Sequence, residues 1–182
     1  MMKKVIVSIL ALSMAVAAFA QKWAPVGENI KSPWAAEVNP AAPLPEYPRP
    51  QMVRADWMNL NGLWNYAITE ASAQTFKADG KILVPFAVES SLSGVGRKIT
   101  KNDALWYERT FTLPRKWNGK NILLHFGAVD WQAEVFVNGV LVGTHKGGYT
   151  SFSFDITNLV RDGENELVVK VEDSFDMQQP RG

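Results

Sequence analysis

The chain has 182 residues, with 19 basic and 18 acidic side chains, no cysteine and 47% apolar content. A nearly neutral chain lacks the basic surplus with which proteins bind nucleic acid, so we expect no nucleic acid partner. The absence of cysteine excludes disulfides, thiolate zinc sites and cysteine nucleophiles. The composition is too apolar and too evenly charged for a disordered chain, and the length predicts one folded domain.

Residues 1–20 have the features of a secretory signal peptide. Lys3 and Lys4 form a charged start, an apolar stretch follows, and Ala18-Phe19-Ala20 supplies an A-x-A cleavage site before Gln21. The apolar stretch is shorter than the roughly 18 to 20 residues that a membrane-spanning helix needs. We therefore expect cleavage between Ala20 and Gln21, no membrane span in the mature chain, and a periplasmic or secreted location.

Residues 21–50 form a proline-rich lead-in that holds seven of the ten prolines. Proline has no amide hydrogen to donate, so this segment is expected to be extended rather than helical or part of a sheet. Trp23, Trp34 and Tyr47 carry larger apolar rings than a solvated linker usually does. Part of the lead-in is therefore expected to lie against a folded body, and a flexible spacer is the alternative.

Residues 51–182 carry the signals of β-strands, beginning with aromatic and branched residues at 62–69, 81–84, 104–113 and 120–126. A hairpin is predicted at 134–142, because Asn138-Gly139 readily takes the positive φ angles of a two-residue type I′ turn. This register places Val137 opposite Val140, Phe136 opposite Leu141, and Val135 opposite Val142.

The last strand signal lies at residues 167–172, where apolar side chains alternate and make one face fully apolar. No window shows sustained helical periodicity, and the one helical turn expected is Ile156 to Val160, capped by Asp155. We therefore predict an all-β fold, a jelly-roll β-sandwich of the galactose-binding-domain-like type, for residues 51–182.

Candidate catalytic and metal-binding residues are few. His125 and His145 are isolated and lack the spacing of a zinc site, so we expect one in a strand and the other in a loop. The glycine-rich segments lack the spacing of nucleotide-binding loops, and no cofactor or metal is expected. Glu108 and Glu134 could in principle form a glycosidase pair about 5 Å apart, but a solvated strand face is the better interpretation.

Seven tryptophans favour a carbohydrate-binding surface, because an aromatic ring can lie against the apolar face of a sugar ring. Trp64 and Trp106 fall within predicted strands and are expected in the core. Trp117 and Trp131 fall at strand edges, where a core position and a surface position are equally compatible with the pattern.

A series of short motifs stands in a fixed order after residue 50. They are Trp57-Met58-Asn59-Leu60-Asn61-Gly62-Leu63-Trp64, Val84-Pro85-Phe86 with Glu89-Ser90, Leu105-Trp106-Tyr107-Glu108-Arg109, Leu124-His125-Phe126-Gly127-Ala128-Val129-Asp130-Trp131, Val137-Asn138-Gly139, Gly147-Gly148-Tyr149, Phe154-Asp155-Ile156-Thr157 and Val169-Lys170-Val171-Glu172-Asp173. The ordered set resembles the N-terminal sugar-binding domain of glycoside hydrolase family 2, the group of β-galactosidases, β-glucuronidases and β-mannosidases.

The resemblance implies more than this chain contains. In that family an immunoglobulin-like sandwich and a TIM barrel follow the jelly roll, and two glutamates of the barrel carry out retaining hydrolysis. The sequence stops at Gly182, so we expect a jelly roll that is incomplete at its C-terminus, no catalytic residue, and no activity for the chain alone. The implied partners are a carbohydrate, as a β-glycoside, and the missing C-terminal immunoglobulin-like and barrel domains.

The resemblance also implies a substrate-binding loop after the V-x-V-x-D strand. Its acidic residue corresponds to Asp173, with Asp176 and Arg181 further along the same loop. The alternative is that Asp173 only caps a turn by accepting backbone amides. Two functions stay open: a non-catalytic carbohydrate-binding and structural domain of an exported retaining β-glycosidase, and a stand-alone secreted carbohydrate-binding or adhesion module.

Overall fold

The computed structural model describes residues 23–28 and 30–173, in which strands and short 3-10 helices are joined by turns. The strands are β1 (Gly62–Glu70), β2 (Gly80–Val84), β3 (Asp103–Thr112), β4 (Leu123–Phe126), β5 (Gln132–Val137), β6 (Val140–Lys146), β7 (Phe152–Asp155) and β8 (Glu164–Glu172). The 3-10 helices are η1 (Pro33–Glu37), η2 (Pro50–Met52), η3 (Ser91–Ser93) and η4 (Arg115–Trp117). These elements confirm the predicted all-β fold.

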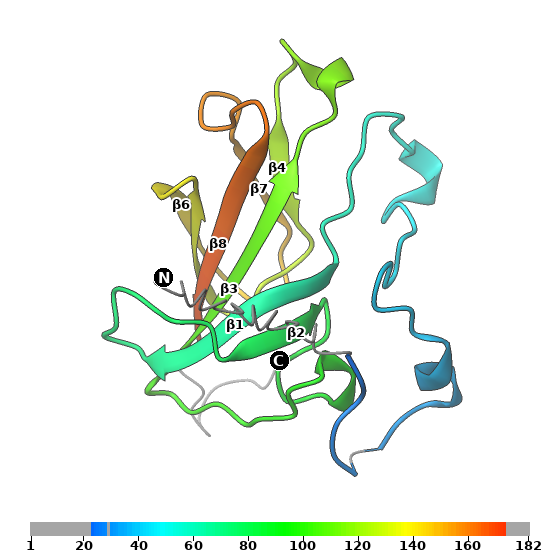
Figure 1. Ribbon diagram of the computed structural model, residues 1–182, viewed down its shortest axis with the longest axis vertical. Helices are drawn as coiled ribbons and strands as arrows, with labels where there is room; N and C mark the ends of the chain where they lie inside the picture. The colour runs from blue at the N-terminus through cyan, green and yellow to red at the C-terminus, as the bar shows by residue number, and fades with distance from the viewer. Residues whose placement is uncertain (1–22, 29, 174–182) are drawn as a thin grey trace, which may run out of the picture.

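The strands form two antiparallel sheets, which Figure 1 shows with β1 and β2 crossing the direction of β3 and β8. One sheet has six strands in the order β2-β1-β3-β8-β5-β6, and the other pairs β4 with β7. At the end of β8, Glu172 pairs with Ala104 of β3 on one side and with Gln132 of β5 on the other. The residue that follows β8 therefore emerges where β3 and β5 begin.

The hydrophobic core lies on one face of the six-stranded sheet, because alternate side chains of its strands point the same way. Leu167, Val169 and Val171 of β8 are buried there, as their alternation predicted. Leu124 of β4 and Ile156 belong to the same cluster, so the two-stranded sheet contributes to one common core. Trp64 is 5% exposed and confirms its predicted core position.

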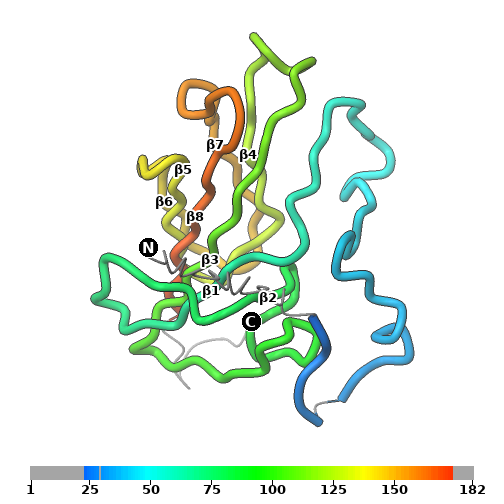
Figure 2. Tube along the Cα trace, viewed as in Figure 1, coloured from blue at the N-terminus to red at the C-terminus, as the bar shows by residue number. Residues whose placement is uncertain are grey.

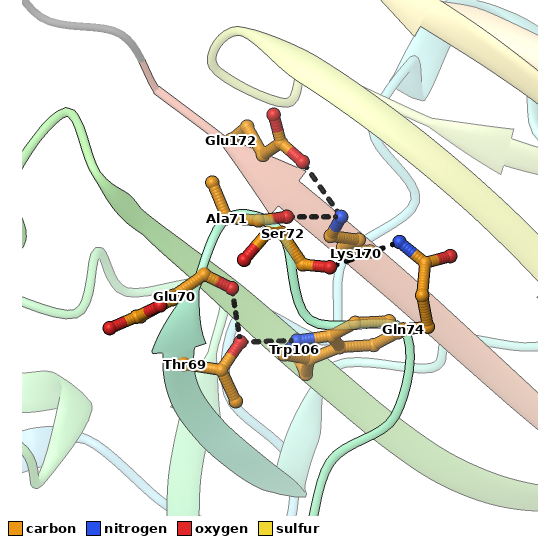
Figure 3. Close-up of polar contacts among 8 residues, drawn as sticks. All are labelled: Thr69, Glu70, Ala71, Ser72, Gln74, Trp106, Lys170 and Glu172. Atoms are coloured by element: carbon orange, nitrogen blue, oxygen red, sulfur yellow. Dashed lines mark hydrogen bonds and ion pairs between the residues drawn. The ribbon is translucent and has the colours of Figure 1, made fainter.

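The opposite face of the six-stranded sheet carries a polar cluster that Figure 3 shows in close-up. Lys170 is buried although it points away from the core, and its Nζ donates to the carbonyl oxygen of Ala71 at 2.9 Å. The same Nζ forms an ion pair with Glu172 at 2.8 Å and lies 5.5 Å from the ring centroid of Trp106. Phe76 stacks on Trp106 at 4.9 Å. Trp106 is thus buried as predicted, but beneath the β1–β2 connection rather than in the core.

The β5–β6 hairpin matches its prediction at the turn and departs from it further along. Asn138 and Gly139 have φ angles of 50° and 78°, and Val137 pairs with Val140. Val135 pairs with Gly143 instead of the predicted Val142, because the register shifts between Val135 and Phe136. The shift brings a glycine to a point that the ring of Phe154 in β7 approaches: a Cβ on Gly143 would lie 2.5 Å from its Cε1.

The predicted turn at Ile156 to Val160 is present, since the amides of Leu159 and Val160 both donate to the carbonyl of Ile156. The Asp155 carboxylate accepts the amide of Thr157 at 2.9 Å and so caps this turn. The expectation that this would be the one helical segment is wrong, because η1 to η4 also form. Two of those helices, η1 and η2, begin at a proline, whose fixed φ suits a helical first position.

Part of the lead-in contacts the folded body, although Figure 2 shows most of it as an arm beside the sandwich. The indole Nε1 of Trp23 donates to the carbonyl of Leu92 at 3.2 Å, and the ring of Tyr47 meets that of Trp57 edge to face at 4.7 Å. Trp34 lies between these anchors and is 69% exposed. The boundary at residue 50 stays a prediction.

Candidate functional site

A hollow of about 260 Å³ lies at the end of β8, and Asp173 lines it. Its other lining residues are Glu89, from the segment between β2 and η3, and Lys98 and Ile99, from the segment that leads into β3. The hollow therefore combines two carboxylates, one ammonium and one apolar side chain from three separate parts of the sequence.

The electrostatics of this hollow disfavour a charged Asp173. Burial raises the pKa of the Asp173 carboxyl above its ordinary value, and the nearby charges of Asp130 and Glu89 raise that pKa further. Burial and the charge of Glu89 also raise the pKa of the Tyr107 phenol. A carboxylate that has lost hydration and faces other carboxylates gains from any donor that enters the hollow. Such a perturbed acid in a concave site is typical of a binding or catalytic position.

Of the substrate-binding residues predicted from the sequence, Asp173 lies in this hollow. Asp176 and Arg181 lie outside the described residues, as do Ala20 and Gln21 of the predicted cleavage site. Sequence reasoning did not assign Lys98, Glu89 or Ile99 to the site. Glu89 stood within a recognised motif, but Lys98 and Ile99 carried no signal, because only the fold brings their segment beside β8.

A second hollow, of about 310 Å³, lies near the start of β1, where this strand pairs with β2 and its pairing with β3 has not yet begun. A polar row crosses the three strands there: Lys81 Nζ donates to Asn65 Oδ1, and Asn65 Nδ2 donates to Glu108 Oε2, each at 2.6 Å. Arg109 Nη1 donates to the carbonyls of Leu60 and Asn61 at 2.6 and 2.8 Å. Burial lowers the pKa of the Arg109 guanidinium. The hollow is lined by Leu63, Asn65, Lys81, Glu108, Arg109 and Thr110.

The two tryptophans considered as surface residues are half-buried and have local partners. Trp117 donates from Nε1 to Asp56 at 3.0 Å, and the ammonium of Lys146 lies 5.5 Å from the ring centroid of Trp131. Neither ring is thus an open platform. Tyr149, which belongs to the Gly147-Gly148-Tyr149 motif, is more exposed than either ring, at 77%.

The two histidines belong to different strands. His125 belongs to β4 and His145 to β6, so the expectation of a loop for His145 is wrong. His145 stacks on Phe152 at 4.0 Å and hydrogen-bonds Thr150 through Nε2 at 3.1 Å, which explains its position without a ligand. Across residues 23–28 and 30–173 no group of three or more His, Asp or Glu side chains could hold a metal ion.

None of the helices within the described part of the chain has the length and apolar character needed to cross a bilayer.

Comparison with known proteins relates this chain to a family of sugar-binding domains. Residues 95–180 match the family model of the glycosyl hydrolases family 2, sugar binding domain. A β-galactosidase of Thermoanaerobacter pseudethanolicus is 43% identical over 67 residues, which are 37% of this chain and 9% of that protein. A β-glucuronidase of Paenibacillus borealis is 35% identical over 99 residues, 52% of this chain and 17% of that protein.

The solved structure of Faecalibacterium prausnitzii β-glucuronidase superposes with a TM-score of 0.55 at 31% identity, covering 63% of this chain and 20% of that one. This chain thus spans a fifth or less of the relatives named here. Residues 95–180 thus match the sugar-binding domain of glycosyl hydrolases family 2, and the chain is homologous to the N-terminal region of β-glucuronidases and β-galactosidases.

Proposed function

We propose that this chain is the non-catalytic, N-terminal carbohydrate-binding and structural domain of an exported retaining β-glycosidase. The observation that carries the proposal is the position of Asp173, which follows the central strand β8 and lines a hollow in a family-2 sugar-binding domain. The proposed role of that hollow is to form part of the rim of a sugar pocket completed by the catalytic part of the enzyme.

The chemistry of the hollow suits the hydroxyl groups of a sugar. A hydroxyl that donates to the Asp173 carboxylate forms a charge-assisted hydrogen bond and offsets the hydration which that carboxylate has lost. The ammonium of Lys98 can donate to a second hydroxyl, while Ile99 offers a small apolar surface. Asp173 would thus position the sugar, and its contribution to the rate would come from a hydrogen bond that strengthens in the transition state.

The substrate class follows from the relatives, which are named as β-glucuronidases and β-galactosidases. We therefore propose a β-glycoside as the substrate of the whole enzyme.

A chimera tests the domain role. Residues 21–182 replace the homologous N-terminal region of the Faecalibacterium prausnitzii β-glucuronidase, and kcat/KM for an aryl β-glucuronide is compared with that of the same enzyme lacking the region. We expect measurable turnover for the chimera and none for the deletion. A chimera that folds cooperatively but turns over no faster than the deletion would contradict the proposal.

The alternative function, a stand-alone carbohydrate-binding or adhesion module, is favoured by the second hollow, whose lining is rich in hydrogen-bonding side chains. Titration of the isolated chain with oligosaccharides tests it. Binding that is lost with Asn65→Ala and kept with Asp173→Ala supports a module that acts alone through the β1–β3 surface.

The proposal of export rests on the charged start, apolar stretch and A-x-A site at residues 1–20. Expression of the full sequence in a bacterium, followed by mass measurement of the periplasmic or secreted product, tests it. A chain that begins at Gln21 supports export, and a full-length chain retained in the cytoplasm contradicts it.

A further inference from the structure

The sequence contains three Asn-Gly pairs, at residues 61–62, 118–119 and 138–139. In such a pair the glycine nitrogen can attack the asparagine side-chain carbonyl, because glycine has no side chain to obstruct the approach. The reaction requires a free side-chain amide and a main chain that can rotate. The fold therefore decides which of the three pairs can react.

Two of the pairs are held in place. Asn138 Nδ2 donates to the Leu159 carbonyl at 2.8 Å and to Asn165 Oδ1 at 2.9 Å, while its Oδ1 accepts the amide of Glu166 at 3.0 Å. Its own backbone amide donates to the carbonyl of Glu166. Rotation of Asn138 would break all four of these bonds at once.

The first pair is held by the main chain and by the lead-in. The carbonyl oxygen of Asn61 accepts Arg109 Nη1 at 2.8 Å, and Asn61 Nδ2 donates to the carbonyl of Pro43 at 3.3 Å. Gly62 is buried at the start of β1 and pairs with Val84 of β2. Attack by the Gly62 nitrogen would thus require the edge of the sheet to open.

The pair at 118–119 lies in an exposed turn after η4. Asn118 and Gly119 are both exposed, and a Cβ on Gly119 would meet no atom within 4 Å. Asn118 has φ −56° and ψ 129°, Gly119 has φ 78°, and the Lys120 amide donates to the Trp117 carbonyl at 3.0 Å. These angles are those of a type II turn. Among the described residues no hydrogen bond holds the side-chain amide of Asn118. Opening this turn therefore costs little free energy and lets the Gly119 nitrogen approach Cγ of Asn118.

We propose that Asn118 is a site of spontaneous deamidation. The Gly119 nitrogen loses its proton to solvent and attacks Cγ of Asn118, and a new C–N bond closes a succinimide ring. The bond from Cγ to the side-chain nitrogen breaks, and that nitrogen takes up a proton from solvent and leaves as ammonia. Water then opens the ring: attack at Cγ gives aspartate in a normal chain, and attack at the main-chain carbonyl gives isoaspartate, in which the chain runs through Cγ. No reactant other than water is needed.

The new carboxylate forms beside the contacts of Asp56, a clamp that holds the segment before β1. Asp56 forms an ion pair with Lys116 at 3.0 Å and a second, short one with Lys120, and it accepts Trp117 Nε1 at 3.0 Å. All three partners of Asp56 are within two residues of position 118. A carboxylate there competes with Asp56 for the two lysines, and the longer isoaspartyl linkage breaks the turn that aligns them. Deamidation of Asn118 therefore loosens the attachment of the segment before β1.

Peptide mapping by mass spectrometry of the full chain, aged in buffer at mildly alkaline pH, tests the modification. We expect conversion at Asn118 to be at least about tenfold faster than at Asn61 or Asn138. Each ~1.4 kcal/mol of additional free energy needed to open the structure locally slows the reaction about tenfold. In concentrated urea the three sites should react at similar rates, since the fold no longer protects any of them. Equal rates at the three sites in the folded protein would overturn the proposal.

Hydrogen exchange tests the effect on the clamp. Aged protein enriched in isoaspartate at position 118 should exchange its amides faster over residues 54–58 than fresh protein does. The matched control is Asn118→Gln, which keeps a neutral amide and should show neither slow modification nor faster exchange on ageing. Unchanged exchange in the modified protein would overturn the loosening of the clamp.

Discussion

The pKa values of two aspartates near strand ends are shifted in opposite directions, and the surroundings of each aspartate explain its shift. Hydrogen bonds from the side chain and then the backbone amide of Thr157 lower the pKa of the Asp155 carboxyl. Burial, followed by the charges of Asp130 and Glu89, raises the pKa of Asp173. Asp155 is thus a turn cap that stabilises the fold when ionised. An ionised Asp173 costs stability, as functional residues often do.

Asp173→Asn should raise the melting temperature at about pH 7, because the neutral amide removes the repulsion and the cost of a buried charge. A raised folded-state pKa means that this cost is present above the folded pKa and has vanished below the unfolded value of about 4. The gain should therefore disappear as the pH falls to that value. Thermal unfolding followed by circular dichroism over this pH range measures it.

Asp155→Asn is the matched control, and its effect on the melting temperature should have the opposite sign. Its lowered folded-state pKa stabilises the protein above the unfolded value, and this stabilisation is lost as the pH falls through the folded pKa. The variant should melt below the parent near neutral pH. If Asp173→Asn also melts lower, Asp173 is a turn residue like Asp155.

At the scale of elements, the hairpin of β5 and β6 depends on both its turn and its neighbours. The Asn138-Gly139 turn could be predicted because positive φ angles favour this residue pair. The bulge at Val135 could not, since the sequence of this hairpin does not show that the ring of Phe154 from β7 lies against Gly143 in the folded protein. Similarly, the position of Trp106 beneath Phe76 depends on a connection with no strand pattern of its own.

Gly143→Ala should lower the free energy of unfolding by about 1 to 3 kcal/mol, because the added methyl group has to displace the Phe154 ring from a packed position. Gly127→Ala is the matched control: no atom lies within 4 Å of a Cβ there, and its φ is not in the positive range. That variant should be neutral or slightly more stable. Urea denaturation of both measures the difference, and equal stabilities would contradict close packing at Gly143.

Asn138→Gly should also destabilise the protein, by about 2 to 3 kcal/mol, since glycine keeps the positive φ but loses three side-chain hydrogen bonds worth roughly 1 kcal/mol each. Asn118→Gly changes an exposed turn and should cost less than about 1 kcal/mol. The two variants can be compared by chemical denaturation. A smaller loss of unfolding free energy for Asn138→Gly than for Asn118→Gly would show that the side-chain hydrogen bonds of Asn138 contribute little to stability.

At the scale of the whole molecule, the all-β architecture could be predicted from strand patterns and turn residues, and the family from an ordered set of motifs. The hollow around Asp173 could be predicted only in part. Asp173 was identified through the family resemblance, whereas Lys98 and Ile99 reach it through the path of the β2–β3 connection. Long connections of this kind carry no periodicity from which their course can be derived.

The purified mature chain should not hydrolyse aryl β-galactosides, β-glucuronides or β-mannosides. Retaining hydrolysis needs two carboxyl groups about 5 Å apart on either side of the anomeric carbon. In the proposed enzyme both of these groups belong to the catalytic part that completes the sugar pocket. Turnover that is abolished by substituting a single carboxylate of this chain would contradict the assignment of a non-catalytic domain.

The most direct test of the proposed role is the effect of Asp173→Ala on kcat/KM in the chimera with the β-glucuronidase of Faecalibacterium prausnitzii. The exposed Asp162→Ala serves as the matched control. If Asp173 binds a sugar hydroxyl, its loss should lower kcat/KM by the equivalent of about 1.5 to 3 kcal/mol, while Asp162→Ala leaves kcat/KM unchanged. A variant that keeps its full kcat/KM and loses only thermal stability would contradict the account.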